Sequence, residues 1–90
     1  MVTRNYRCRR GEIDLVMRDG DTLAFVEVRY RKSDKFGSPA ESVTLTKQRR
    51  IIQAARHYLQ RHPSALDCRF DVLALTGDEQ VEWLKNAFME

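Results

Sequence analysis

The sequence of 90 residues lacks long hydrophobic runs, internal repeats and linker-like segments. Only four glycines and two prolines interrupt it, which excludes collagen-like and low-complexity classes. No apolar stretch approaches the roughly 18 residues that a membrane helix needs. Residues 1–10 are too polar and basic to form the core of a signal peptide. We therefore expect a cytoplasmic protein with no membrane contact.

Cysteines are also scarce, and the two that are present, Cys8 and Cys68, lie far apart. Neither has another Cys or His beside it at the spacing of a zinc site, so we expect two reduced thiols. The chain does contain 42% hydrophobic and 32% charged residues, the proportions of a folded globular protein. A chain this short has room for one hydrophobic core, and residues 1–90 are expected to form a single domain.

Charge is distributed unevenly along the chain. Residues 1–62 contain 14 Lys and Arg against 7 Asp and Glu, a balance of +7. Residues 63–90 contain 2 against 6, a balance of −4, which gives the net charge of +3. The basic part is expected to face a polyanion such as nucleic acid, although a solvated basic surface has the same composition.

Hydrophobic periodicity predicts the order β-β-β-α-β. Apolar and polar residues alternate in the expected strands, whereas in the expected helix apolar residues recur every three or four positions, after a Thr cap and before a proline. Segment 31–42 is expected to be a loop, and residues 81–84 a last short strand or a helical turn. The expected strands span residues 5–9, 12–17, 22–30 and 68–75, and the expected helix spans residues 46–62.

This order predicts an α/β protein with a mixed sheet, because a helix between two strands packs on one sheet face. A parallel part of a sheet usually needs cover on both faces, and one helix covers only one of them. We therefore expect one of two arrangements. Either an N-terminal helix is missing from this chain, or a partner chain, such as the second copy of a homodimer, covers the other face.

A tight turn at Gly20–Asp21 makes a specific prediction about the two longest strands. Counting back from this turn sets Asp14 opposite Glu27. The same count sets Glu12 opposite Arg29, and it places all four side chains on one face. A turn one residue earlier changes the pairs but keeps the same four side chains together.

Two carboxylates on neighbouring strands repel each other, at a cost of about 0.2 to 1 kcal/mol. A shared proton, a basic neighbour such as Arg29 or a divalent cation removes this repulsion, and Mg²⁺ or Mn²⁺ suits carboxylate oxygens. Such a cation polarises a phosphodiester and lowers the pKa of a bound water. The alternative is a pair of surface acids in salt bridges with Arg29 and Arg31.

Five short motifs follow one another along the chain. They are Asn5-x-Arg7, Gly11-Glu12-Ile13-Asp14-Leu15, the run from Phe25 to Arg31, Ser42-Val43 with Lys47, and the run from Arg69 to Val72. In this order they resemble the YraN family of small bacterial proteins over nearly the whole chain. That family is similar in turn to the PD-(D/E)xK nuclease superfamily and to archaeal Holliday-junction resolvases. The resemblance implies a restriction-endonuclease-like αβββαβ sheet, from which this chain lacks the first helix and its Glu.

The resemblance also implies roles for the residues around the pair of acids. Asp14 and Glu27 are implied as catalytic, metal-binding carboxylates, with the Val28 carbonyl as a third metal ligand. Arg29 stands where the superfamily has its Lys. An Arg at this place can hold a phosphate with two hydrogen bonds, but it cannot lose its proton and so cannot act as a base.

Five further residues are expected to assist. The resemblance makes Glu12 an accessory acid, and Lys32 could replace the superfamily Lys by reaching back from the end of its strand. Arg31, Lys47 and Arg50 are expected to contact nucleic acid, the last two from the start of the helix, where amides and basic side chains hold phosphates. A solvated helix face is the alternative for Lys47 and Arg50.

Together these features predict a metal-dependent, nuclease-like enzyme that acts on DNA, with branched or damaged DNA as the expected substrate. Two alternatives stay open. One is a nucleic-acid-binding module on a nuclease fold that no longer cuts, which Arg29 in place of Lys favours. The other is an interaction protein that uses the open sheet face.

Overall fold

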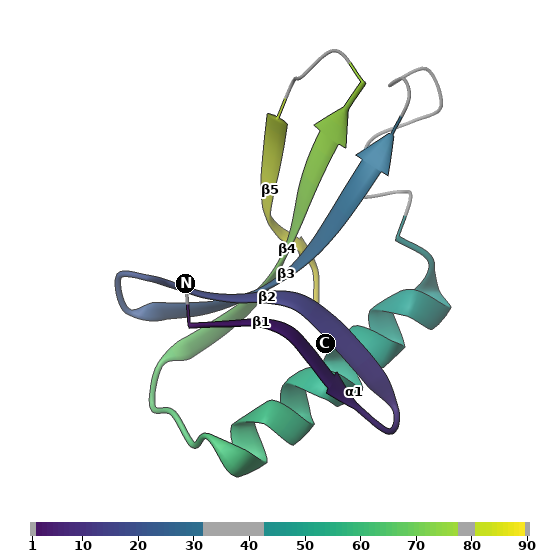
Figure 1. Cartoon of the computed structure of the whole chain (residues 1–90). Coiled ribbons are helices and arrows are strands. Elements are labelled where there is room, and N and C mark those ends of the chain that lie inside the picture. Colours follow the sequence, from purple (N-terminus) through teal and green to yellow (C-terminus); the bar gives the residue numbers. More distant parts are fainter. Residues whose placement is uncertain (1, 32–42, 78–80, 90) are drawn as a thin grey trace.

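Strands flank a single long helix in the part of the chain that the structure describes (Figure 1). The computed structural model describes residues 2–31, 43–77 and 81–89. The elements are β1 (Thr3–Cys8), β2 (Gly11–Asp19), β3 (Thr22–Arg31), α1 (Leu45–Arg61), β4 (Asp67–Thr76) and β5 (Val81–Phe88). This order confirms the predicted β-β-β-α-β arrangement, and the last segment, expected to be a strand or a helical turn, is the strand β5.

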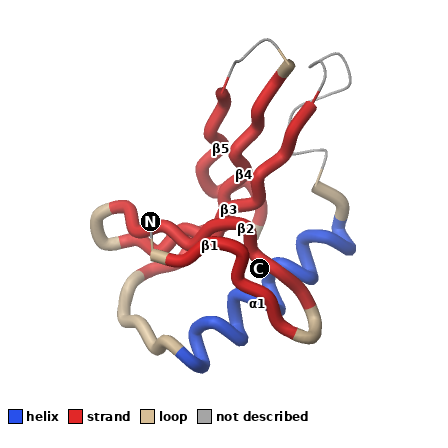
Figure 2. The backbone as a smooth tube through the Cα atoms, viewed as in Figure 1, coloured by secondary structure: helices blue, strands red, loops and turns tan. Residues whose placement is uncertain are grey.

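The strands form one mixed sheet in the order β1-β2-β3-β4-β5. Only β3 and β4 are parallel, and they pair from Thr22–Asp67 to Arg31–Thr76. The connection between them contains α1, because parallel neighbours need a long crossover. In Figure 2 the β1–β2 hairpin curves away from the far ends of β3, β4 and β5 and lies alongside α1. The predicted mixed α/β class is therefore correct.

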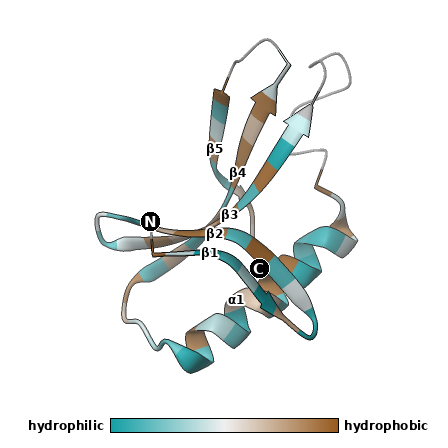
Figure 3. Cartoon of the chain, viewed as in Figure 1, coloured by the Kyte–Doolittle hydropathy of each residue, from teal (hydrophilic) through white to brown (hydrophobic). Residues whose placement is uncertain are grey.

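Helix α1 forms where the apolar spacing predicts it, with its ends one residue earlier than expected. The Thr44 hydroxyl accepts a hydrogen bond from the Lys47 amide at 3.2 Å and caps the helix. At the other end His62 closes the last turn, and Pro63 cannot continue it. Hydrophobic and hydrophilic bands alternate along α1 in Figure 3, as expected of a helix with one buried side.

The hydrophobic core lies between α1 and the sheet. Tyr58 of α1 packs edge-on against Phe25 of β3 and Tyr6 of β1, with ring centres 5.9 and 5.2 Å apart. Phe25 also lies beside Phe70 of β4. The fully buried hydrophobic side chains include Ile13, Val16, Phe25, Val26, Ile51 and Val72.

Gly11, the first residue of β2, is where the β1–β2 hairpin meets α1. A Cβ atom built on Gly11 overlaps the carbonyl oxygen of Arg50 and lies 2.7 Å from its carbonyl carbon. No side chain fits between the two backbones. The glycine therefore sets how closely the hairpin approaches the helix.

Strand β2 separates from β3 halfway along its length. Their paired residues run from Asp19–Thr22 to Leu15–Val26, which confirms the Gly20–Asp21 turn. The predicted strand pairs of Asp14 with Glu27 and of Glu12 with Arg29 are therefore wrong, because the β2–β3 pairing ends before them. On its other side β2 stays paired with β1, where Glu12 lies opposite Arg7. The buried residues Ile13 and Val16 are three positions apart, so strict alternation is broken between them. Counting from the turn could not anticipate this break.

Strand β5 extends beyond the short segment expected at residues 81–84. It runs to Phe88, with an interruption where Asn86 adopts a positive φ of 54° and the pairing register shifts opposite Phe70 and Val72. Asn tolerates this left-handed conformation better than most residues. The polar residues at this interruption break the alternation that would have predicted the whole strand.

The sheet face opposite α1 carries exposed aromatic and aliphatic side chains. Tyr30, Leu75 and Val81 are paired across β3, β4 and β5, and Tyr30 and Val81 are 68% and 65% exposed. Alternation from Phe25 places Tyr30 on the face away from α1.

Within the described ranges no helix is long and apolar enough to cross a membrane.

Candidate functional site

The candidate site lies where β2 leaves β3, close to the first turn of α1. Asp14 is the first residue of β2 beyond the last β2–β3 pair. Its Oδ2 atom accepts a hydrogen bond from the Val28 amide at 2.8 Å, so the side chain takes the place of the missing backbone partner. The Asp14 carboxylate is thereby held beside Glu27, the neighbour of Val28.

Glu27 is a buried acid on β3, with only 4% of its surface exposed. Its Oε1 atom lies 3.7 Å from Lys47 Nζ and 3.9 Å from Arg29 Nε. Its Oε2 atom is buried, and no described residue forms a hydrogen bond with it. The pKa of Glu27 is raised to about 6, mainly because burial disfavours its charged form and also because of the negative charge of Asp14, while Lys47 and Arg29 partly oppose the rise.

Lys47 joins the acids from the helix side. Its Nζ atom lies 3.4 Å from Glu12 Oε1 and 3.7 Å from Glu27 Oε1, and 22% of the side chain is exposed. The Thr44 cap fixes the start of α1 and so sets the position from which Lys47 reaches the sheet. Sequence reasoning named Lys47 only as a contact for nucleic acid and missed its place among the acids. The Ser42-Val43 motif with Lys47 was the available signal.

Glu12 takes part through ion pairs and not through the strand pairing expected for it. Its carboxylate lies 3.6 Å from Arg7 Nε and 3.4 Å from Lys47 Nζ, and 38% of its side chain is exposed. Lys47 thus bridges Glu12 and Glu27. The structure brings Asp14, Glu27, Arg29 and Glu12 into one neighbourhood, as the sequence predicted, although by a different geometry.

The remaining predicted residues are less closely tied to this neighbourhood. Arg50 is exposed on α1, and its backbone carbonyl packs against Gly11. Arg31 ends β3, but its side chain lies outside the described residues, and so does Lys32. The Val28 amide is used by Asp14, and the predicted role of its carbonyl stays a prediction.

The donor atoms suit a hard divalent cation. Asp14 and Glu27 supply carboxylate oxygens, and the buried Oε2 of Glu27 has a free coordination position with respect to the described residues. In residues 2–31, 43–77 and 81–89, no group of three or more His, Cys, Asp or Glu side chains is gathered closely enough to hold a metal by itself. A cation here would take its other ligands from backbone oxygen, water or a phosphate, as Mg²⁺ usually does.

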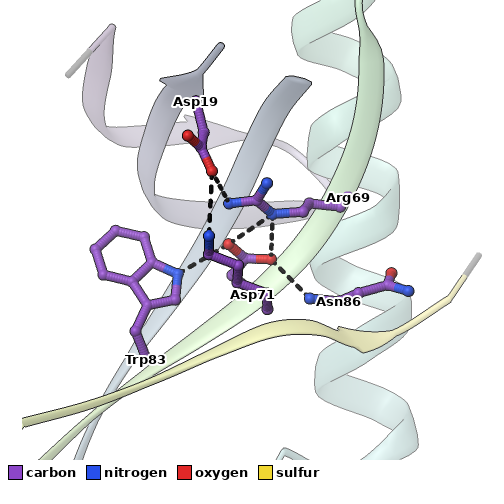
Figure 4. A network of polar contacts seen from close by, with 6 residues as sticks. Asp19, Arg69, Asp71, Trp83 and Asn86 are labelled. Carbon is purple, nitrogen blue, oxygen red and sulfur yellow. Dashed lines mark hydrogen bonds and ion pairs between the residues drawn. The ribbon is translucent and has the colours of Figure 1, made fainter. Parts of the chain in front are cut away.

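A second acidic centre lies around Asp71 on β4 (Figure 4). Asp71 is fully buried, and Arg69 Nε donates to both of its oxygens at 3.0 Å. Trp83 Nε1 and the Asn86 amide complete the set at 2.8 and 2.9 Å. Arg69 also contacts Asp19, and this contact lowers the pKa of Asp19. Asp71 is thus a buried acid with structural partners.

Fold and site together define a small mixed α/β protein with a pair of carboxylates at the split between two strands. The chain belongs to the uncharacterised protein family UPF0102, whose model matches residues 1–75. It is 52% identical over 92 residues to a UPF0102 protein of Nitrosomonas europaea, covering 100% of this chain and 78% of the relative.

Two further relatives belong to the same family. A UPF0102 protein of Nitrosospira multiformis is 56% identical over 90 residues, which cover 98% of this chain and 76% of that protein. A UPF0102 protein of Aeromonas hydrophila is 58% identical over 90 residues, covering 97% and 68% respectively. UPF0102 is the YraN family that the motifs resemble, so the predicted family membership is confirmed.

Proposed function

We propose that this protein is a divalent-cation-dependent, nuclease-like enzyme that acts on DNA in the cytoplasm. The observation that supports this most is Glu27, a buried carboxylate that stands beside a second acid and has one oxygen without a hydrogen-bond partner in the described chain. A fold gains nothing from such a group, because an unsatisfied buried carboxylate is costly. A bound cation would remove that cost and the repulsion from Asp14.

Asp14 and Glu27 would hold the Mg²⁺ or Mn²⁺ ion. Bound there, the ion would polarise a phosphodiester and lower the pKa of a water. The protein's own part is to fix the two carboxylates, and the Val28 amide does this for Asp14. Branched or damaged DNA fits the resemblance to Holliday-junction resolvases.

Two cationic side chains flank the carboxylates and suit a phosphate. Arg29 has a guanidinium that is one-third exposed and can hold a phosphate through two hydrogen bonds. Lys47 contacts the same carboxylate from the opposite element. A lysine, unlike an arginine, can lose its proton, so Lys47 supplies the amine that Arg29 cannot replace.

The direct test is the change of Asp14 to Asn, which keeps an oxygen for the Val28 amide but removes the charge. Wild-type protein should cleave branched or single-stranded DNA with Mn²⁺ or Mg²⁺, and EDTA should stop the cleavage. Asp14→Asn should lower the rate about 100-fold or more, whereas Asp21→Asn, in the exposed turn, should leave it unchanged. Cleavage that continues undiminished in Asp14→Asn would overturn the assignment.

Titration with Mn²⁺ gives a second measurement that does not depend on finding the right DNA. The carboxyl NMR signals of Asp14 and Glu27 should broaden before those of the other acids. Uniform broadening of all exposed carboxylates would contradict a cation site at this place.

A second candidate function is DNA binding without cleavage. The observation that favours it is Lys47, whose ammonium already compensates the charge of Glu12 and Glu27 without a cation. Salt-dependent DNA binding that persists in EDTA and in Glu27→Ala, with no cleavage at any Mn²⁺ concentration, would select this candidate. Concentration-dependent assembly with no affinity for DNA would instead select an interaction protein.

A further inference from the structure

A basic groove lies between the β1–β2 turn and the outer side of α1. Its volume is about 270 Å³. Of the lining residues that the structure describes, three are arginines, two are glutamines and none is acidic. The lining residues are Cys8, Arg9, Arg10, Gln53, Arg56, His57 and Gln60, and we call this surface the arginine groove.

The two walls of the arginine groove are held in place by contacts beneath it. The hydroxyl of Tyr6 on β1 forms a hydrogen bond with Nδ1 of His57 on α1, and the Tyr6 ring packs edge-on against Tyr58. Gly11 allows the end of the turn to lie directly on the helix backbone. Figure 1 shows the turn between β1 and β2 beside the middle of α1. The arginines are therefore presented from two fixed elements.

The chemistry of the arginine groove is that of a phosphate site. Arginine binds phosphate oxygens through two parallel hydrogen bonds, and glutamine amides and the second nitrogen of His57 add further hydrogen-bonding groups. Arg9 and Arg10 are exposed, and so they can reach a large ligand. Among the described lining residues the charged groups are all arginines, so the groove is positive in this part of the chain.

The arginine groove is separate from the acidic site, by which we mean Asp14, Glu27 and their neighbours, but both adjoin the β1–β2 hairpin and α1. Arg10 of the groove precedes Glu12 by two residues, which is about 7 Å along an extended chain. Arg56 follows Lys47 by nine residues, which is about 14 Å along the helix axis and two and a half turns around it. A strand that reaches the acidic site would therefore enter the groove by crossing the hairpin turn beside Arg10 and not by running straight along α1.

We propose that the arginine groove binds the sugar–phosphate backbone of the DNA strand on which the acidic site acts, a few nucleotides from the reacting phosphate. This inference rests on the proposed function for its ligand, but the groove itself rests on its own residues. Contacts to phosphates carry no sequence information, so the groove positions the strand and does not select a sequence.

The test compares two double variants that remove the same charge. Arg9→Gln with Arg10→Gln empties one wall of the groove, and Arg4→Gln with Arg18→Gln removes two exposed arginines outside it. Binding of a fluorescent oligonucleotide is measured in EDTA at several salt concentrations. The groove variant should bind about tenfold or more weakly at 0.15 M salt, and its salt slope should fall by about 1.8 for duplex DNA.

Cys8 supplies a second measurement in a protein with all its arginines. In a Cys68→Ser background, Cys8 is the remaining thiol, and it lines the groove. Saturating oligonucleotide should slow its reaction with iodoacetamide severalfold. An unchanged rate, or an equal loss of affinity in the two double variants, would overturn the proposal.

Both measurements are made without a cation and are therefore independent of cleavage. Protection of Cys8 without any cleavage in Mn²⁺ would support the arginine groove and overturn the proposed activity. Cleavage that depends on Asp14 without protection of Cys8 would overturn the groove alone. A protein that neither binds nor cleaves DNA would overturn both.

Discussion

Glu27 and Asp71 are the two buried acids in the described part of the chain. They differ in how completely hydrogen bonds and neighbouring cations compensate the charge of the carboxylate. Asp71 pairs in register with Val26, the residue before Glu27, so the two carboxylates point to opposite sheet faces. Donors from Arg69, Trp83 and Asn86 satisfy both oxygens of Asp71. Glu27 has cations at 3.7 and 3.9 Å, a like-charged neighbour and one oxygen without a hydrogen bond to a described residue.

This difference separates a structural acid from a candidate functional one. A buried carboxylate with complete hydrogen bonding stabilises its surroundings only while all its partners remain. A buried carboxylate with incomplete bonding destabilises the fold and is available for a ligand. Three substitutions test this distinction between Asp71 and Glu27.

The largest effect is expected for Asp71→Ala. Without the carboxylate, the charge of Arg69 and the donors of Trp83 and Asn86 lose their acceptor. We expect the free energy of unfolding to fall by about 3 to 5 kcal/mol in urea denaturation. The exposed acid Asp67, on the same strand, is the control, and its change to Ala should cost less than about 0.5 kcal/mol. Equal effects would show that the Asp71 contacts are not stabilising.

Glu27→Gln should have the opposite sign and depend on pH. The pKa of Glu27 is 4.5 when unfolded and about 6 when folded, so the unfolded chain releases its proton first. Wild-type stability should therefore fall as the pH rises from about 4.5 to 6, by about 2 kcal/mol in total, a loss that the variant lacks.

The measurement is urea denaturation of both proteins at pH 4 and pH 7, without divalent cations. At pH 7 the Gln variant should be the more stable of the two, and at pH 4 the two should be similar. A variant that is less stable at both values would mean that the ion pairs with Lys47 and Arg29 outweigh the burial of the charge.

The smallest effect is expected for Trp83→Phe, which removes one of the donors to Asp71 and keeps an aromatic ring. The indole is 40% exposed, and Arg69 and Asn86 still satisfy the carboxylate. We expect a loss of about 1 to 2 kcal/mol in the free energy of unfolding. A loss as large as that of Asp71→Ala would show that the contacts around Asp71 fail as a unit.

The sequence predicted those parts of the fold that depend on local patterns. The Gly20–Asp21 turn, the helix that begins after Thr44 and the strand through Phe70 all follow from spacing and turn chemistry. The interruption at Asn86 did not, because a bulge depends on what the strand must pass, here Asp71. Local propensity contains no such information.

The candidate site was predicted in its residues but not in its geometry. The turn predicted that Asp14 lies close to Glu27, but the two are not a strand pair, because the pairing of β2 with β3 ends at Leu15 and Val26. For the same reason Glu12 does not lie opposite Arg29. The position of Lys47 depends on how α1 docks on the sheet. Docking is decided by core side chains from several elements, and a single segment does not reveal it.

The acidic site and the arginine groove both depend on Gly11, because this residue sets how closely the β1–β2 hairpin lies on α1. Its missing side chain lets the hairpin rest on Arg50, and the next residue, Glu12, faces Lys47, while the preceding arginines line the groove. Any side chain at position 11 would push the β1–β2 hairpin away from α1 and would displace both the acidic site and the arginine groove. When position 11 is replaced at random, few variants other than the glycine protein should therefore bind or cleave DNA, although residue 11 contacts neither the cation nor the DNA in the proposed sites.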